Sequence, residues 1–401
     1  ALPRGISRHV VRFVNLSGRV LAVKEIGETV AHREYDLLRD LVRIDAPSVM
    51  PVAVVTGRRD PNGEELNGVL VTEHMQYSLP YRALFRQSLT PQTADKLIDA
   101  LAVLLVRLHL LGFYWGDVSL SNTLFRRDAE SFAAYLVDAE TGELHAQLTD
   151  GQRCYDLDLA RVNIIGELMD LQAGGYLGEE ADAIDIGNRI VERYDQLWGA
   201  LTAPEYIAAG QNWRITERIE KLNALGFSID ELTMSSDPEN QRIMIQPKVV
   251  DAGHYHRMIM KLTGMDVEEA QARRMLDDMD TYRMVHDLGN MPLELAAHQW
   301  QREEFDPVIN AIPPHLVGKL QPAQIYHEYL EHKWFLAQQA QHDLPTDVAV
   351  ASYIKNVLEG RTDESIFLEP DPLTDTIELV AIREHENEET DSQETEEQTN
   401  G

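Results

Sequence analysis

A long amphipathic helix pattern that ends directly before a polar loop constrains the fold of this chain more than any other feature. Thr90 suits the N-cap of this helix and Pro91 suits its first position. One face of the pattern stays apolar, through Leu97, Leu101, Leu104 and Leu108. The loop 115–122 follows, and the apolar segments 122–125 and 133–140 then predict two short strands of a hairpin.

Three polar residues of the loop and hairpin have a spacing that suits metal-assisted phosphoryl transfer. Asp117 precedes Asn122 by five residues, and Asp138 ends the next predicted strand. Phosphoryl transfer needs an oriented hydroxyl and positioned metal ions, and carboxylate and amide oxygens bind Mg²⁺ well. We predict that Asp117 orients or deprotonates an acceptor, Asn122 binds one Mg²⁺ and Asp138 bridges the metals. The alternative is that all three are ordinary turn and capping residues.

The N-terminal part of the chain is predicted to form strands around one helix at about 29–43. The predicted strands are rich in β-branched residues and separated by turn signals: 10–14, 19–26, 49–55 and 68–75. Lys24 interrupts the second strand, while Glu34 lies on the apolar face of the helix. Because an unpaired buried charge is costly, we predict an ion pair between them. Glu28 is the alternative partner, and two unrelated surface charges are the remaining interpretation.

The second half of the chain is predicted to be mainly helical. Residues 157–199 have a helical pattern, and 201–383 continue it, interrupted by a strand pair at 227–234 and 241–250. The tail 384–401 contains eight acidic residues and no Lys or Arg. Such a segment cannot bury enough apolar surface to fold, so we expect it to be disordered.

The charge balance excludes several classes of partner. The chain has 36 Lys and Arg against 67 Asp and Glu, a net charge of -31, which disfavours nucleic acid and anionic membrane surfaces. No segment approaches the ~20 apolar residues of a membrane span. With Cys154 as its one cysteine, the chain cannot form an intrachain disulfide, which fits a reducing compartment. We expect an acidic cytoplasmic protein with no integral membrane segment.

The segment 327–332, HEYLEH, is one residue longer than a zinc-protease motif. Helical residues are ~100° apart, so His327 and His332 point about 140° apart and do not face one metal. We therefore expect exposed helix histidines.

These features together resemble the protein-kinase superfamily. The shared set is a strand lysine, a helix glutamate, a long helix, the Asp117–Asn122 loop and Asp138. The atypical branch of RIO, lipopolysaccharide and aminoglycoside kinases is the most similar. The segments WGDVSLSNTLFRR and YLVDAETGEL further resemble a bacterial family that pairs such a domain with a C-terminal domain of unknown function, DUF4032.

The resemblance implies an α+β chain, with a two-lobed protein-kinase-like domain followed by a mainly α-helical domain. The expected N-lobe covers 1–78, with a trimmed or missing first strand, and the expected C-lobe covers 79–200. The helical domain is expected at 201–383 and the acidic tail at 384–401. ATP and Mg²⁺ are the implied cofactors. An aspartate that supports the catalytic loop is implied at Asp156 or Asp158.

The resemblance also implies a nucleotide site in the N-lobe. Thr72 corresponds to the gatekeeper residue, and backbone groups of Glu73 and Met75 would hydrogen-bond adenine. Val10 and Ala22 are implied to cover adenine from above. Gly5 and Ser7 are implied to form the phosphate loop, and Lys24 is implied to bind the phosphates.

Departures from the kinase pattern bear on the acceptor. No GxGxxG motif is present, Trp115 replaces the usual histidine, and Ser119 replaces the lysine of conventional protein kinases. We therefore expect an ATP- and Mg-dependent phosphotransferase that acts on a small-molecule or sugar hydroxyl rather than on a protein. One alternative is a pseudokinase or nucleotide-binding scaffold that binds a protein partner through 201–383. Another is a helical interaction protein in which the motif is coincidental.

Overall fold

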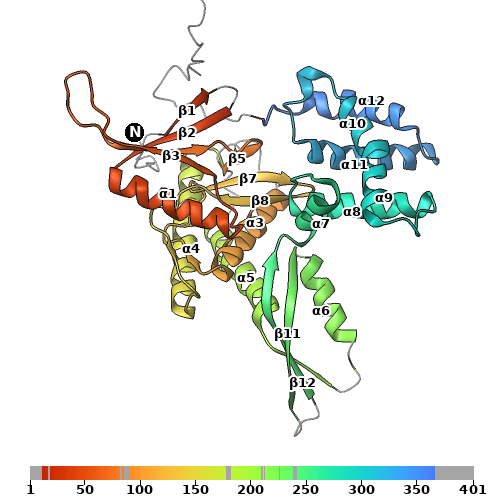
Figure 1. Ribbon diagram of the computed structural model, residues 1–401, viewed down its shortest axis with the longest axis horizontal. Coiled ribbons are helices and arrows are strands. Elements are labelled where there is room, and N and C mark those ends of the chain that lie inside the picture. The colour runs from red at the N-terminus through yellow and green to blue at the C-terminus, as the bar shows by residue number, and fades with distance from the viewer. Residues whose placement is uncertain are drawn as a thin grey trace, which may run out of the picture. The chain divides into compact units, whose positions relative to one another are not determined.

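The computed structural model divides the chain into two compact units, which we describe separately (Figure 1). The sheet unit contains 11–35 and 50–74, and the main unit contains 36–49 and 75–365. The structure describes the following residues: 11–16, 19–81, 84, 91–177, 182–208, 211, 213–224, 226–237 and 242–365.

The sheet unit is built on an antiparallel sheet with the strand order β1-β2-β4-β3. Its strands are β1 (Val11–Leu16), β2 (Arg19–Ile26), β3 (Pro51–Val55) and β4 (Gly68–Glu73). Helix α1 (Glu28–Arg43) starts in this unit and ends in the main unit. All four strands and the helix agree with the sequence prediction to within a few residues, which is the usual uncertainty of element ends.

Three long helices form the core of the first part of the main unit. They are α3 (Pro91–Leu110), α4 (Asp150–Ala173) and α5 (Ala183–Thr202). The four leucines that defined the α3 pattern are all buried. The predicted helical region 157–199 starts too late, because Thr149 and Gln152 form a capping box that begins α4 seven residues earlier.

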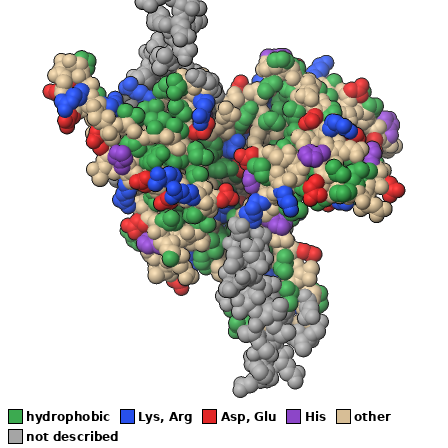
Figure 2. Space-filling view, viewed as in Figure 1, with side chains coloured by type: hydrophobic (Ala, Val, Ile, Leu, Met, Phe, Trp, Pro, Cys, Tyr) green, Lys and Arg blue, Asp and Glu red, His purple; other side chains and the backbone are tan. Residues whose placement is uncertain are grey.

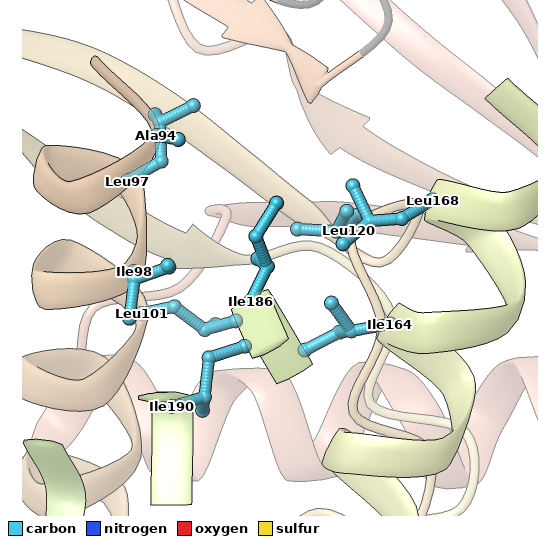
Figure 3. Close-up of a pocket in the computed structure, with 9 residues that line it drawn as sticks. All are labelled: Ala94, Leu97, Ile98, Leu101, Leu120, Ile164, Leu168, Ile186 and Ile190. Atoms are coloured by element: carbon cyan, nitrogen blue, oxygen red, sulfur yellow. The ribbon is translucent and has the colours of Figure 1, made fainter. Parts of the chain in front are cut away.

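A small pocket lies among α3, α4 and α5 (Figure 3). Its lining is entirely apolar: Ala94, Leu97, Ile98, Leu101, Leu120, Ile164, Leu168, Ile186 and Ile190. A pocket with no polar side chain offers nothing to bind a phosphate or a metal ion. We therefore assign it to core packing, behind the loop that carries Asp117.

Short strands surround the predicted loop. Strands β5 (Ser78–Pro80), β7 (Thr123–Asp128) and β8 (Ser131–Leu136) form one sheet in the order β5-β7-β8, and β6 (Phe113–Tyr114) pairs with β9 (Glu143–Leu144). The prediction that the second hairpin strand extends to residue 140 is wrong. Strand β8 ends at Leu136, and Asp138 therefore lies two residues beyond it.

The C-terminal region begins with a three-stranded sheet and continues as a group of helices. The first part contains β10 (Glu205–Ala208), α6 (Trp213–Ala224), β11 (Phe227–Asp237) and β12 (Arg242–Ala252), with the strand order β10-β12-β11. The helices are α7 (His254–Thr263), α8 (Glu269–Val285), α9 (Leu293–Trp300), α10 (Asp306–Asn310), α11 (Pro322–Ala340) and α12 (Thr346–Asn356). The predicted strand pair is present as β11 and β12, whereas β10 was not predicted. The predicted tail 384–401 lies outside the described residues.

Large aromatic side chains fill the core of the helical group. Trp300, Tyr326, Tyr329 and Tyr353 are all buried there. On the face shown in Figure 2, the surface of this group mixes acidic, basic and apolar side chains rather than gathering one sign of charge. The helices in the described part of the chain are each too short or too polar to cross a membrane.

The β7–β8 hairpin contacts the C-terminal helices through charged side chains. Asp128 accepts hydrogen bonds from the N–H groups of Ala270 (3.0 Å) and Gln271 (2.7 Å), in the first turn of α8. These N–H groups have no partner within the helix, and a carboxylate there is also favoured by the helix dipole. Arg126 pairs with Glu268 at 2.9 Å, beside this contact. The end of β7 therefore caps a helix that follows it by more than a hundred residues.

Burial raises the pKa of Asp128 to about 7, and the nearby Glu268 carboxylate adds to the rise, against the effect of the two N–H donors. Because the unfolded pKa is about 3.9, the folded chain holds a proton that the unfolded chain lacks between about pH 4 and pH 7. The free energy of unfolding should therefore fall as the pH rises through this range. In Asp128→Asn this contribution is absent, so the thermal midpoint should decline less between pH 5 and pH 8 than in the wild type.

The matched control is Asp277→Asn, an exposed residue of the same helix α8. Its thermal midpoint should follow the wild-type pH dependence. Equal slopes for Asp128→Asn and the wild type would contradict the raised pKa.

Candidate active site

The predicted ion pair of the sheet unit is present. Lys24 Nζ lies 3.0 Å from Glu34 Oε2 and 3.3 Å from Oε1, and the two side chains are only 13% and 1% exposed. Strand β2 carries the lysine and the buried face of α1 carries the glutamate. Glu28, the alternative partner, instead accepts a hydrogen bond from the Gly57 N–H at 2.8 Å. The interpretation of Lys24 and Glu34 as unrelated surface charges is therefore wrong.

Strand β4 holds the predicted gatekeeper Thr72 and one of the two residues predicted to hydrogen-bond adenine, Glu73. Thr72 lies opposite Ala22 of β2, so these two predicted residues are neighbours in the sheet. The Glu73 N–H donates to the Met50 carbonyl at 2.8 Å. Any contact between Glu73 and adenine would therefore use the Glu73 carbonyl.

The other predicted nucleotide-site residues divide between described and undescribed segments. The carbonyl of Met75 accepts hydrogen bonds from the N–H (3.3 Å) and hydroxyl (2.7 Å) of Ser78, so contact with adenine would use the Met75 N–H. Gly5, Ser7 and Val10 lie outside the described residues. The nucleotide-binding roles of all these residues remain predictions.

The main unit brings Asp117 and Asn122 into contact. The Asn122 amide Nδ2 donates to the Asp117 carbonyl at 3.0 Å and to its carboxylate Oδ2 at 3.2 Å. Since the amide hydrogens are directed at Asp117, Oδ1 is the atom of Asn122 that a metal could use. The Asn122 carbonyl accepts a hydrogen bond from the Val137 N–H at 3.0 Å, which sets Asn122 beside the residue that precedes Asp138.

Trp115 fixes the backbone of Asp138. Its side chain is fully buried, and its indole Nε1–H donates to the Asp138 carbonyl at 2.8 Å. The Trp115 carbonyl in turn accepts a hydrogen bond from the Thr141 hydroxyl at 2.8 Å. The tryptophan that departs from the kinase pattern thus ties the loop to the segment after β8.

Glu140 is an acidic residue of this segment that the sequence analysis did not consider as a ligand. Its N–H donates to Asp138 Oδ1 at 3.0 Å, which forms a tight turn. The carboxylate oxygens of Asp138 and Glu140 lie within 4.8 Å of each other. Two hard oxygen donors at this separation suit Mg²⁺.

One face of α4 holds the loop backbone. We call it the α4 polar face, and it consists of Asp156, Asn163 and Glu167. Glu167 accepts hydrogen bonds from the N–H groups of Leu120 (2.7 Å) and Ser121 (3.0 Å). These three side chains lie within about 40° of each other around the helix axis, because their positions are i, i+7 and i+11.

Asn163 contacts the middle of the loop. Its Nδ2 donates to the Val118 carbonyl at 3.1 Å and lies 3.4 Å from Asp117 Oδ1. Asn122 and Asn163 thus approach the Asp117 carboxylate from two sides. Neither Asn163 nor Glu167 was predicted, although their periodic spacing from Asp156 on a helix is visible in the sequence.

Asp156 is fully buried and binds the start of the loop. Its carboxylate accepts hydrogen bonds from the N–H groups of Trp115 (2.9 Å) and Gly116 (2.8 Å), and lies 3.1 Å from His109 Nε2. Gly116 has a φ of 78°, a left-handed conformation that favours glycine. Asp158, the alternative loop support, is exposed, so Asp156 is the residue that holds the loop.

Buried polar contacts continue beyond Asp156 into α3 and α5. His109 Nδ1 lies 2.7 Å from the Tyr194 hydroxyl, and burial raises the pKa of Tyr194. Arg153 stacks its guanidinium on Trp198, 3.9 Å from the ring centre, beside this contact. The loop support therefore extends through all three core helices.

A helix-held loop with Asp117 and Asn122, followed by a hairpin and Asp138, defines a kinase-like domain. Residues 15–166 match the model of the lipopolysaccharide kinase (Kdo/WaaP) family, and residues 196–358 match the model of a domain of unknown function, DUF4032. The two matches confirm the predicted resemblance and the predicted fold class, and they support the interpretation as an atypical kinase. The boundaries predicted for the individual domains remain predictions.

Two further comparisons are less informative. One solved structure, "WaaP in complex with acyl carrier protein", is 15% identical to this chain. The match covers 56% of this chain and 87% of the chain in that structure, with a TM-score of 0.35. No curated protein matches the chain.

The buried Lys24–Glu34 pair predicts strong energetic coupling between the two side chains. Glu34→Gln leaves the ammonium without its counter-charge and should lower the free energy of unfolding by about 3 kcal/mol. Lys24→Met in the same chain should recover part of this loss. Denaturant unfolding of the wild type, both single variants and the double variant measures the coupling.

Asp36→Asn provides the control, because it removes a salt bridge to Arg39 on the exposed side of the same helix. Its effect should stay below about 1 kcal/mol. Additive effects of the Lys24 and Glu34 substitutions would show that the pair is not coupled.

Proposed function

We propose that this chain transfers a phosphoryl group from Mg·ATP to a hydroxyl group of a sugar or another small molecule. The observation that carries the proposal is the Asp117–Asn122 contact, on a loop that the α4 polar face holds in place. The carboxylate of Asp117 is oriented by Asn122 at 3.2 Å and approached by Asn163 at 3.4 Å. A positioned carboxylate is what a phosphotransferase needs to orient an attacking hydroxyl.

The donor set of the main unit fits Mg²⁺. Asn122 offers an amide oxygen, and Asp138 and Glu140 offer carboxylate oxygens that lie within 4.8 Å of each other. These are hard ligands of the kind that Mg²⁺ prefers over softer nitrogen or sulfur donors. When bound, Mg²⁺ would neutralise charge on the transferring phosphate group.

Lys24 is the proposed contact to the α- and β-phosphates. Glu34 holds its ammonium at 3.0 Å, so the side chain is oriented before any nucleotide binds. Backbone groups of Glu73 and Met75 are the proposed adenine contacts, and Thr72 is the proposed gatekeeper.

Ser119 supports a small-molecule acceptor. It is 6% exposed, and its hydroxyl lies 3.2 Å both from the Asn122 N–H and from the Ser121 hydroxyl. Where conventional protein kinases place a lysine that neutralises phosphate, this chain has a buried residue that supports its own loop. The family name of the match, lipopolysaccharide kinase, makes a sugar hydroxyl of the lipopolysaccharide core the first acceptor to test.

Phosphoryl transfer should depend on Asp117. The assay follows transfer of label from γ-labelled ATP with Mg²⁺ to lipopolysaccharide core sugars and a panel of small hydroxyl compounds. Asp117→Asn keeps the side-chain shape but removes the charge that orients the acceptor, and should slow transfer by roughly 10²- to 10⁴-fold.

Asp158→Asn is the matched control, because Asp158 is an exposed carboxylate of α4 outside the α4 polar face. It should transfer phosphate at the wild-type rate. Transfer that persists in Asp117→Asn would contradict the assigned role. Nucleotide binding without transfer to any acceptor would favour the scaffold alternative, with a protein partner for the C-terminal region.

A further inference from the structure

One face of α11 holds the turn between β7 and β8. The Gln324 side chain accepts a hydrogen bond from the Ala129 N–H (3.0 Å) and donates one to the Ala129 carbonyl (3.1 Å). Ala129 has a φ of 54°, so this reciprocal contact stabilises an unfavourable turn conformation. The next residue, Glu130, is therefore fixed next to α11.

Three metal-binding side chains meet at this contact. One ligand atom from each of Glu130, His327 and Glu331 lies within 4.8 Å of the others. His327 and Glu331 are at i and i+4 of α11, which places them on one helix face. Gln324 is at i-3 from His327 on the same face, so the residue that holds the turn also brings Glu130 to the other two.

The expectation that His327 is an exposed helix histidine is wrong. Its side chain is 5% exposed, because this face of α11 packs into the interior. The buried Nδ1 has no hydrogen-bond partner among the described residues, and Nε2 lies 3.6 Å from Glu331 Oε2, beyond hydrogen-bond distance. A buried imidazole without a hydrogen bond is costly, unless a ligand uses its lone pair.

We propose that Glu130, His327 and Glu331 bind one divalent transition-metal ion, with Zn²⁺ as the first choice. One imidazole nitrogen and two carboxylate oxygens form a three-ligand set that leaves a position for water. Imidazole is a good ligand for Zn²⁺ and a poor one for Mg²⁺, so this site differs in chemistry from the oxygen-only set of Asn122, Asp138 and Glu140. The ion would join the β7–β8 turn to the C-terminal helices.

The test is isothermal titration of metal-free full-length protein with ZnCl₂, in the absence of nucleotide. The wild type should bind one Zn²⁺ with an affinity that Glu130→Gln and Glu331→Gln each weaken by more than about tenfold, the least that loss of even an outer-shell partner costs. Both glutamates are exposed, so the variants should fold, and circular dichroism checks that they do. With MgCl₂, Glu130→Gln and Glu331→Gln should behave as the wild type does, because imidazole is a poor Mg²⁺ ligand.

Two control variants separate this site from nonspecific binding. His332→Gln removes the second histidine of the HEYLEH segment, whose Nε2 lies 2.9 Å from the Ser352 hydroxyl, and should leave Zn²⁺ affinity unchanged. Glu192→Gln removes an exposed carboxylate of α5 and should also leave it unchanged. The proposal is overturned if the wild type binds no Zn²⁺, or if Glu130→Gln and Glu331→Gln bind it as tightly as the controls do. Because no nucleotide is used, the outcome is independent of the phosphotransferase proposal.

Discussion

The main unit depends on the buried carboxylate of Asp156. It accepts hydrogen bonds from the N–H groups of Trp115 and Gly116 and contacts His109, so one side chain binds the start of the loop to helix α3. Hydrogen bonds to a charged group contribute about 1.5–3 kcal/mol each, and a buried carboxylate without them would be strongly destabilising. The start of the loop and the left-handed conformation of Gly116 depend on this anchor, while Asn122 and Asn163 orient the Asp117 carboxylate.

Strand β7 connects the candidate active site to the C-terminal region. It begins directly after Asn122 and ends at Asp128, which caps helix α8. The strand therefore follows a proposed metal ligand directly at one end and contacts helix α8 at the other. The turn that follows supplies Glu130 to the proposed Zn²⁺ site.

Much of the fold could be predicted because its signals are local. The apolar face of α3, the strands of the sheet unit and the charged residues at apolar positions are periodic patterns within short segments. Lys24 and Glu34 were paired from the cost of burying either charge alone, and the structure shows that contact.

The parts that were missed depend on long-range contacts. Nothing local distinguishes Asp128 from an ordinary turn residue, since its partners are the N–H groups of α8. His327 looked exposed because the helix pattern does not show which face packs inward, and Glu130 is distant from it in sequence. The α4 polar face could be predicted in part. The helical spacing of Asn163 and Glu167 is visible in the sequence, but the sequence does not show that the loop lies against α4.

The most direct test of the account is calorimetric titration of the full-length chain with ATP, in Mg²⁺ and separately in EDTA, for the wild type and Asp138→Asn. The account predicts binding that requires Mg²⁺ and that weakens at least about tenfold in Asp138→Asn, while Asp158→Asn binds as the wild type does. Equal binding with and without Mg²⁺, or no effect of Asp138→Asn, would contradict the assigned metal site. No binding in any condition would contradict the account of this domain as a phosphotransferase.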